Sequence, residues 1–276
     1  MQVSGNNFFT ASDGAHIYYE DRGHGPAIVM IPGFLCTAKF FEKNAEALSE
    51  QFRVVTVDPR GQGYSSKTTG GNTLKRHALD IKELVDHLGL ESFVLLGWSL
   101  ASSVVVTYAS EFNQYKLKGL VTMDGSLFPF SGDDWNHHRG KNYNVQNWHN
   151  VYMPLFYNPE EFYAKFFQRI GLREEDREWV TEQCRLSAPW SCIELHYDFS
   201  HTDNVSNLKK ITVPAAFFGA QSKDYGLDMV EKFASEVSGY SEVVKFYESG
   251  HLMFLYEADK FNSELARFVK KAYEMN

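Results

Sequence analysis

The segment 93–108, with the sequence FVLLGWSLASSVVVTY, constrains the fold of the chain more than any other stretch. It opens with four apolar residues, as expected for a strand buried on both faces, and residues 102–110 are small and apolar enough for a buried helix. Ser99 lies between them. We therefore expect it on a sharp turn that presents its hydroxyl at the carboxyl edge of a sheet, in front of the positive end of a helix. The pattern is typical of the nucleophile elbow G-x-S-x-G, with Ala101 in place of the last glycine; the alternative is a serine that only caps a helix.

Length and composition narrow the class of protein. The chain has 276 residues, 43% of them hydrophobic and 22% charged, as in a soluble globular domain that can carry one large insertion. Its net charge of -8 argues against nucleic acid and anionic membranes as partners. No apolar run approaches the roughly 20 residues of a membrane helix, and no signal peptide is predicted at the N-terminus. The three cysteines, Cys36, Cys184 and Cys192, have no metal-ligand spacing, which indicates reduced thiols and a cytoplasmic location. The sequence leaves open whether the protein forms a homodimer.

Strand and helix patterns alternate along most of the chain. Two antiparallel strands are expected at 8–10 and 16–19. Buried strands follow at 27–31, 53–57, 93–96, 120–123, 215–219 and 243–247. Helices are predicted between them at about 38–50, 74–88, 102–110 and 228–237, and after the last strand at 258–273. This order predicts an α/β fold with a mostly parallel sheet of about eight strands and helices on both faces.

The alternation stops between residues 126 and 210, where the sequence becomes polar and rich in aromatic residues. Helical patterns are visible there at 159–170 and 174–186. We therefore expect a core domain made of residues 1–125 and 211–276, with 126–210 as a helical insertion.

Four motifs resemble those of the α/β-hydrolase fold family, in order and in spacing. They are Pro-Gly-Phe at 32–34, Asp-Pro-Arg-Gly-Gln-Gly-Tyr-Ser at 58–65, Gly-Trp-Ser-Leu-Ala at 97–101 and Ser-Gly-His at 249–251. The resemblance covers nearly the whole chain and implies a helical cap inserted after the sixth strand. Two departures are Pro32, where members usually have histidine, and Ala101. The family includes esterases, lipases, lactonases, peptidases, carbon–carbon hydrolases, lyases and cofactor-free dioxygenases, so the fold alone does not fix the reaction.

A serine nucleophile needs a base, and the base needs an acid to orient it. His251 follows a predicted strand, and the resemblance implies that its loop delivers the base to Ser99. For the acid two positions stay open. Asp124 directly follows the strand at 120–123, as in some lipases and the dioxygenase branch, whereas Asp224 follows the next strand but two places later than the commonest arrangement. The sequence favours Asp124.

The backbone N–H groups of Phe34 and Leu100 are the candidate oxyanion donors. Asp58 and Arg60 are expected to brace nearby loops. Gly61-Gln62-Gly63 falls short of a phosphate-binding fingerprint, and no cofactor is expected. Histidines and aspartates in the insertion have no metal-ligand spacing, so no metal site is predicted among His137, His138, His149, His196, His201, Asp133 and Asp134.

The aromatic insertion is expected to cover a hydrophobic substrate, although more than half of its rings should pack the cap on the core. Candidate substrate-binding residues are Trp98, Phe128, Trp135, Trp148, Tyr152 and Leu252. The leading hypothesis is a serine hydrolase of the carboxylesterase or lactonase type (EC 3.1.1), which cleaves a small-to-medium hydrophobic ester or lactone through an acyl-enzyme. The alternative is a cofactor-free dioxygenase or lyase in which His251 is the base and Ser99 only binds substrate. A ligand-binding protein without turnover is a third, less favoured hypothesis.

Overall fold

A computed structural model describes residues 7–136, 143–221 and 226–275. One twisted sheet runs through the molecule in the order β1-β2-β4-β3-β5-β6-β7-β8. The first two strands are antiparallel and β3 to β8 are parallel, as the sequence predicted. The strands are β1 Phe8–Thr10, β2 His16–Arg22, β3 Ala27–Ile31, β4 Arg53–Val57, β5 Phe93–Trp98, β6 Leu117–Met123, β7 Ala215–Ala220 and β8 Ser241–Phe246.

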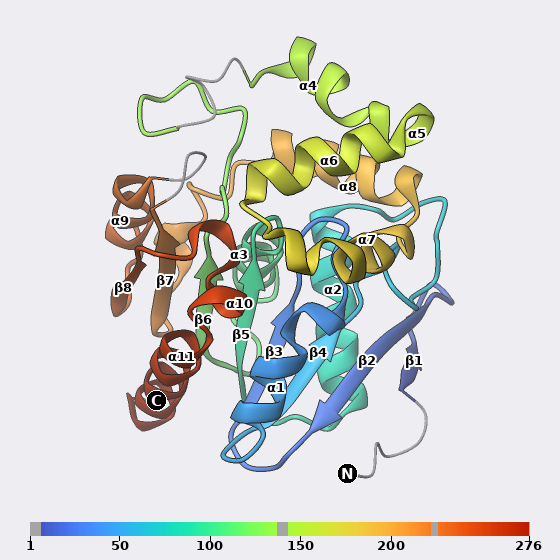
Figure 1. Cartoon of the computed structure of the whole chain (residues 1–276). Helices are drawn as coiled ribbons and strands as arrows, with labels where there is room; N and C mark the ends of the chain where they lie inside the picture. Colours follow the sequence, from blue (N-terminus) through green and yellow to red (C-terminus); the bar gives the residue numbers. More distant parts are fainter. Residues whose placement is uncertain (1–6, 137–142, 222–225, 276) are drawn as a thin grey trace.

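Helices cover both faces of this sheet (Figure 1). Helices α1 (Glu42–Leu48) and α11 (Ala258–Met275) pack together on one face, and α2 (Leu74–His87) and α3 (Ala101–Glu111) pack together on the other. Helix α9 (Leu227–Ser235) packs against β7 and β8. All residues of β3 and β5 are buried, because both of their faces lie under helices. None of the helices in the described residues is long and apolar enough to cross a membrane.

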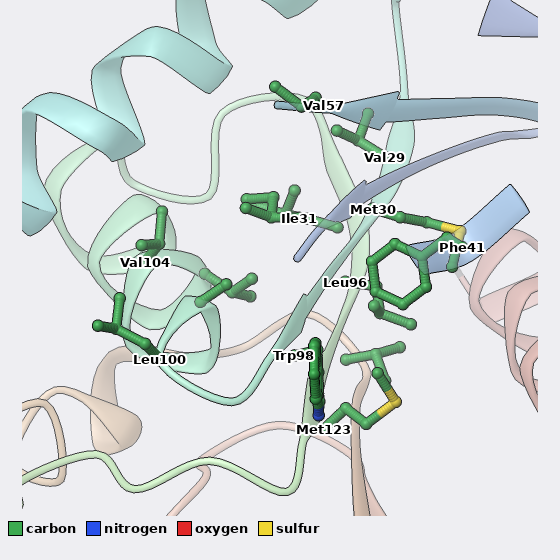
Figure 2. Packing of buried hydrophobic residues seen from close by; sticks show 14 of the residues in the cluster. Val29, Met30, Ile31, Phe41, Val57, Leu96, Trp98, Leu100, Val104 and Met123 are labelled. Carbon is green, nitrogen blue, oxygen red and sulfur yellow. The ribbon is translucent and has the colours of Figure 1, made fainter. Parts of the chain in front are cut away.

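The side chains of the central strands alternate between the two faces. Figure 2 shows Met30 and Leu96 beside Phe41, while Ile31 points the other way, toward Val104 of α3. This period of two is the reason that a continuous apolar run can fill both layers of the core. Trp98, the last residue of β5, shares its face with Leu96 and lies directly before Ser99.

In the described residues between β6 and β7, five α-helices lie over the edge of the sheet where the parallel strands end (Figure 1). They are α4 Val145–Tyr152, α5 Pro154–Tyr157, α6 Pro159–Ile170, α7 Arg177–Arg185 and α8 Pro189–His201. Proline occupies the first turn of α6 and α8, where its missing N–H costs nothing, and Gly171 ends α6 with a φ of 74°.

Two predicted helices are interrupted at their start. The helix expected at 38–50 begins with a 3₁₀ turn at Ala38–Phe41, and the helix expected at 174–186 begins with a 3₁₀ turn at Glu174–Asp176. At the second turn, the Asp176 carboxylate accepts hydrogen bonds from Trp179 Nε1 and from the Tyr256 hydroxyl of the core. These two hydrogen bonds hold the 3₁₀ turn in place, and no local sequence pattern predicts them.

Candidate active site

Ser99 occupies a strained turn between β5 and α3. Its φ of 58° is left-handed, which is uncommon for a non-glycine residue and persists only where neighbours impose it. The Ser99 N–H donates to the carbonyl of Met123 at 2.8 Å, and its own carbonyl accepts from the Ser102 N–H at 2.9 Å. The side chain is partly accessible, and its hydroxyl has no hydrogen-bond partner in the described part of the chain. The elbow predicted from the sequence is therefore formed, with its hydroxyl available.

Glycines make this turn sterically feasible. A Cβ at Gly97 would lie 2.2 Å from the carbonyl oxygen of Ala101, so strand and helix could not approach as they do. A Cβ at Gly125 would lie 2.1 Å from the Ser99 carbonyl oxygen, and one at Gly33 would lie 2.9 Å from Ser99 Cβ. The close approach depends on these glycines, and Ala101 is accommodated at the start of α3 with 1% of its surface exposed.

Asp124 and His251 form a buried pair. His251 Nδ1 lies 2.7 Å from Asp124 Oδ2, and the carboxylate side chain is fully buried. Asp124 directly follows β6 with a φ of 45°; its N–H donates to Phe218 and its Oδ1 accepts from the Ala220 N–H at 3.2 Å. An ionised carboxylate can only accept, so the proton of the neutral imidazole lies on Nδ1 and Nε2 has a lone pair. The alternative acid, Asp224, lies outside the described residues.

Trp98 anchors the loop that carries His251. The Trp98 indole Nε1 donates to the backbone carbonyl of His251 at 3.0 Å, and the two rings lie 5.1 Å apart. On the other side, Glu257 accepts hydrogen bonds from the Ser249 hydroxyl and N–H. No hydrogen bond joins Ser99 to His251, both of which are described; in ligand-free sites such bonds are often long and tighten when substrate binds.

The two candidate oxyanion donors have N–H groups for which the described residues offer no acceptor. Leu100 precedes the first turn of α3, where backbone N–H groups lack intrahelical partners. Phe34 lies in the loop after β3, 5% exposed, and the carbonyl of Gly33 before it accepts from the Cys36 N–H at 3.1 Å.

An aromatic layer surrounds Phe34. The rings of Tyr152, Phe162 and Phe166 meet it edge-on, with centroids 5.8 to 6.4 Å away. His196 of α8 lies 5.0 Å from Phe34 and 3.8 Å from Tyr152. Because the indole of Trp148 can only donate, its 3.0 Å contact with His196 Nδ1 gives this histidine the Nε2–H tautomer. Sequence reasoning left His196 among the histidines of the insertion, and no local signal placed it beside Phe34.

The remaining predicted substrate-binding residues are dispersed. Trp98 and Leu252 are 1% and 0% exposed, and the Trp98 ring packs 4.8 Å from Phe254. Trp135 packs against Phe233 of α9 at 5.4 Å, and Phe128 is half-buried just after β6.

Asp58 and Arg60 brace loops, as expected. Asp58 accepts the N–H groups of Ala38 and Tyr64, both at 2.7 Å, and burial raises its pKa to about 6. Burial opposes the charge of Arg60, but its ion pairs with Asp80 and Asp13 raise its pKa above the usual range. Arg60 thereby ties helix α2 to the turn between β1 and β2.

Within 7–136, 143–221 and 226–275, no three His, Cys, Asp or Glu side chains form a group that could hold a metal ion; His137 and His138 fall outside these ranges. All three cysteines are buried free thiols, and burial raises the pKa of Cys192 to about 12.

Comparisons with known proteins identify the fold family of the chain. The family model described as alpha/beta hydrolase fold matches residues 26–258. The bifunctional esterase/perhydrolase of Acinetobacter calcoaceticus is 25% identical over 284 residues, which cover 95% of this chain and 99% of that protein. The AB hydrolase superfamily protein YisY of Bacillus subtilis is 23% identical over 254 residues, 91% and 94% of the two chains. An esterase (EaEST) from Exiguobacterium antarcticum superposes with a TM-score of 0.87 at 24% identity, covering 96% and 99%. With its eight-stranded sheet and its elbow serine, the chain belongs to the alpha/beta hydrolase fold family.

Proposed function

We propose that this protein is a serine hydrolase that cleaves a small-to-medium hydrophobic carboxylic ester or lactone through an acyl-enzyme. Ser99 is the nucleophile, His251 the general base and Asp124 the residue that orients the base. The observation that carries the proposal is the buried 2.7 Å contact between His251 and Asp124, on a loop tied by Trp98 to the elbow of Ser99.

The proposed reaction follows from the protonation states. His251 Nε2 accepts the proton of the Ser99 hydroxyl while the oxygen attacks the carbonyl carbon. The resulting imidazolium is stabilised by Asp124, which keeps its charge. The carbonyl oxygen becomes an oxyanion, which the N–H groups of Phe34 and Leu100 bind; losing one such donor typically costs about 10²–10³ in kcat.

His251 then gives its proton to the leaving alkoxide, and the acyl-enzyme remains. In the second half-reaction His251 deprotonates a water molecule, which attacks the acyl carbon, and Ser99 takes the proton back as the acid is released. For a lactone, the freed hydroxyl stays attached to the acyl group throughout, and the last step releases a single hydroxy acid.

The substrate class follows from the aromatic layer. We propose that residues 126–210 act as a cap whose rings at Tyr152, Phe162 and Phe166, together with Phe34, enclose an apolar acyl or alcohol group. The names of related proteins support ester chemistry, since the Acinetobacter calcoaceticus relative is an esterase/perhydrolase and the Exiguobacterium antarcticum neighbour an esterase.

A second candidate is a cofactor-free dioxygenase or lyase. It is favoured by one observation: the His251–Asp124 pair is complete, whereas the Ser99 hydroxyl makes no hydrogen bond to it. In such an enzyme His251 would take a proton from the substrate itself, and Ser99 would only bind.

Covalent labelling separates the two functions. A fluorophosphonate probe should label Ser99, and p-nitrophenyl butyrate should be hydrolysed by the wild type but not by Ser99→Ala. Ser110→Ala, which removes a hydroxyl at the far end of α3, is the matched control and should keep full activity. Equal ester turnover by wild type and Ser99→Ala would refute the serine hydrolase.

A further inference from the structure

We propose that Gln62 is a positioning residue for the oxyanion hole. It holds the loop after β3 in the conformation that aims the Phe34 N–H at the substrate oxygen. The inference rests on the proposed function and gives a role to the central residue of the 58–65 motif, which the reaction itself leaves unused.

The loop contains a strained residue next to the donor. Leu35, directly after Phe34, has a φ of 64° and is fully buried. A leucine adopts this left-handed conformation only where the surrounding structure over-determines it. Both polar groups of its backbone are held: its N–H donates to Gln62 Oε1 at 2.5 Å, and its carbonyl accepts from the Ser187 hydroxyl at 3.4 Å.

The orientation of the Phe34 N–H depends on two neighbouring peptide planes. The plane between Gly33 and Phe34 carries that N–H on one side and the Gly33 carbonyl on the other. The Cys36 N–H binds this carbonyl at 3.1 Å and so anchors the plane. The next plane, between Phe34 and Leu35, is anchored by Gln62. Without Gln62 the second plane can rotate and Leu35 can leave the left-handed region. The Cys36 N–H, which directly follows Leu35, then moves away from the Gly33 carbonyl, and the Phe34 N–H is no longer fixed.

Gln62 is itself rigid enough for this role. It is 2% exposed, its N–H donates to Pro59 at 2.9 Å and its carbonyl accepts from Ser65 at 3.1 Å. At the other end of the same loop, Asp58 accepts the Ala38 N–H at 2.7 Å. The segments 58–65 and 33–38 are therefore joined at two points, and only the Gln62 contact lies beside the proposed donor.

The kinetic test replaces the acceptor while keeping the volume. Gln62→Met and Gln62→Leu remove the carbonyl oxygen, whereas Gln62→Glu keeps an oxygen facing Leu35. Because an oxyanion donor acts in the transition state, we expect kcat to fall about 10–100-fold in both apolar variants, with KM within about 2-fold. Gln62→Glu should keep kcat within about 3-fold of the wild type.

A transition-state analogue and hydrogen exchange provide the independent readouts. The inhibition constant of a trifluoromethyl ketone, whose adduct carries an oxyanion, should rise by the same factor as kcat falls. Amide exchange of a peptide spanning 33–38 should accelerate in the two apolar variants and not in Gln62→Glu. If Gln62 only stabilised the fold, the two apolar variants would instead have a lower Tm, and the ratio of analogue affinity to substrate affinity would stay as in the wild type.

The outcomes are distinct. If the wild type hydrolyses esters and Ser99→Ala does not, yet the apolar Gln62 variants keep normal kcat and analogue affinity, only this inference falls. It also falls if Gln62→Glu is as impaired as Gln62→Met, or if exchange at 33–38 does not change. If the wild type neither hydrolyses esters nor labels at Ser99, the proposed function falls and the inference falls with it.

Discussion

Asp124→Asn changes the proposed site by a single exchange of an oxygen for an NH₂ group. Asp124 Oδ1 accepts the Ala220 N–H, and Oδ2 lies 2.7 Å from His251 Nδ1. A backbone N–H can only donate, so the asparagine must keep its oxygen toward Ala220. Its NH₂ group then faces His251, whose Nδ1 has to accept a hydrogen bond instead of donating one.

The tautomer of His251 is therefore inverted. The proton moves to Nε2, which can no longer accept the proton of Ser99. A loss of this kind is expected to lower kcat about 10⁴-fold, equivalent to about 5.4 kcal/mol of transition-state stabilisation, with KM little changed. Stability should change by less than about 1 kcal/mol, because the buried amide keeps a partner on each side.

The assay is steady-state hydrolysis of p-nitrophenyl butyrate by the purified variant, with a thermal melt as a check on folding. Asp224→Asn, the other acid weighed from the sequence, is the matched control and should keep kcat within about 3-fold. The reasoning is refuted if a folded Asp124→Asn enzyme keeps more than about a tenth of wild-type kcat. It is refuted equally if Asp224→Asn is the variant that loses activity.

Two further predictions concern stability. Gly97→Ala puts a Cβ 2.2 Å from the Ala101 carbonyl oxygen and should lower the free energy of unfolding by about 3 kcal/mol or more, which corresponds to a fall in Tm of roughly 6–12 °C. The control Gly70→Ala has open space around its Cβ and should change Tm by less than about 2 °C. Equal Tm values for the two variants would contradict the steric argument. Because the pKa of Asp58 is raised to about 6 by burial, from 3.8, its contribution to stability is present below pH 3.8 and lost as pH rises through 6. In urea titrations, the free energy of unfolding of Asp58→Asn relative to that of the wild type should therefore rise by about 2 kcal/mol between pH 4 and pH 7. A difference that stays constant with pH would show that burial does not destabilise the Asp58 carboxylate.

The amino-acid sequence by itself determined the strands, the helices between them and the turn at Ser99, because each depends on residues close together in the chain. Buried strands need continuous apolar runs, and the elbow needs glycine and alanine around Ser99, so the sheet, its alternating helices and the turn were all predictable. The positions of Asp124 and His251, each after a strand end, could also be read from the chain, and they placed the proposed site at the carboxyl edge of the sheet.

Helix α8 escaped prediction because its apolar residues lie on several of its faces, since it packs against both α2 and α5. The left-handed Leu35 escaped as well, because no propensity predicts a leucine there. The bond from Gln62 to Leu35 spans 27 positions, and that from Trp98 to the His251 carbonyl spans 153. Such contacts depend on which segments the folded sheet brings together, and therefore only the tertiary structure decided how the proposed base and oxyanion donors are held.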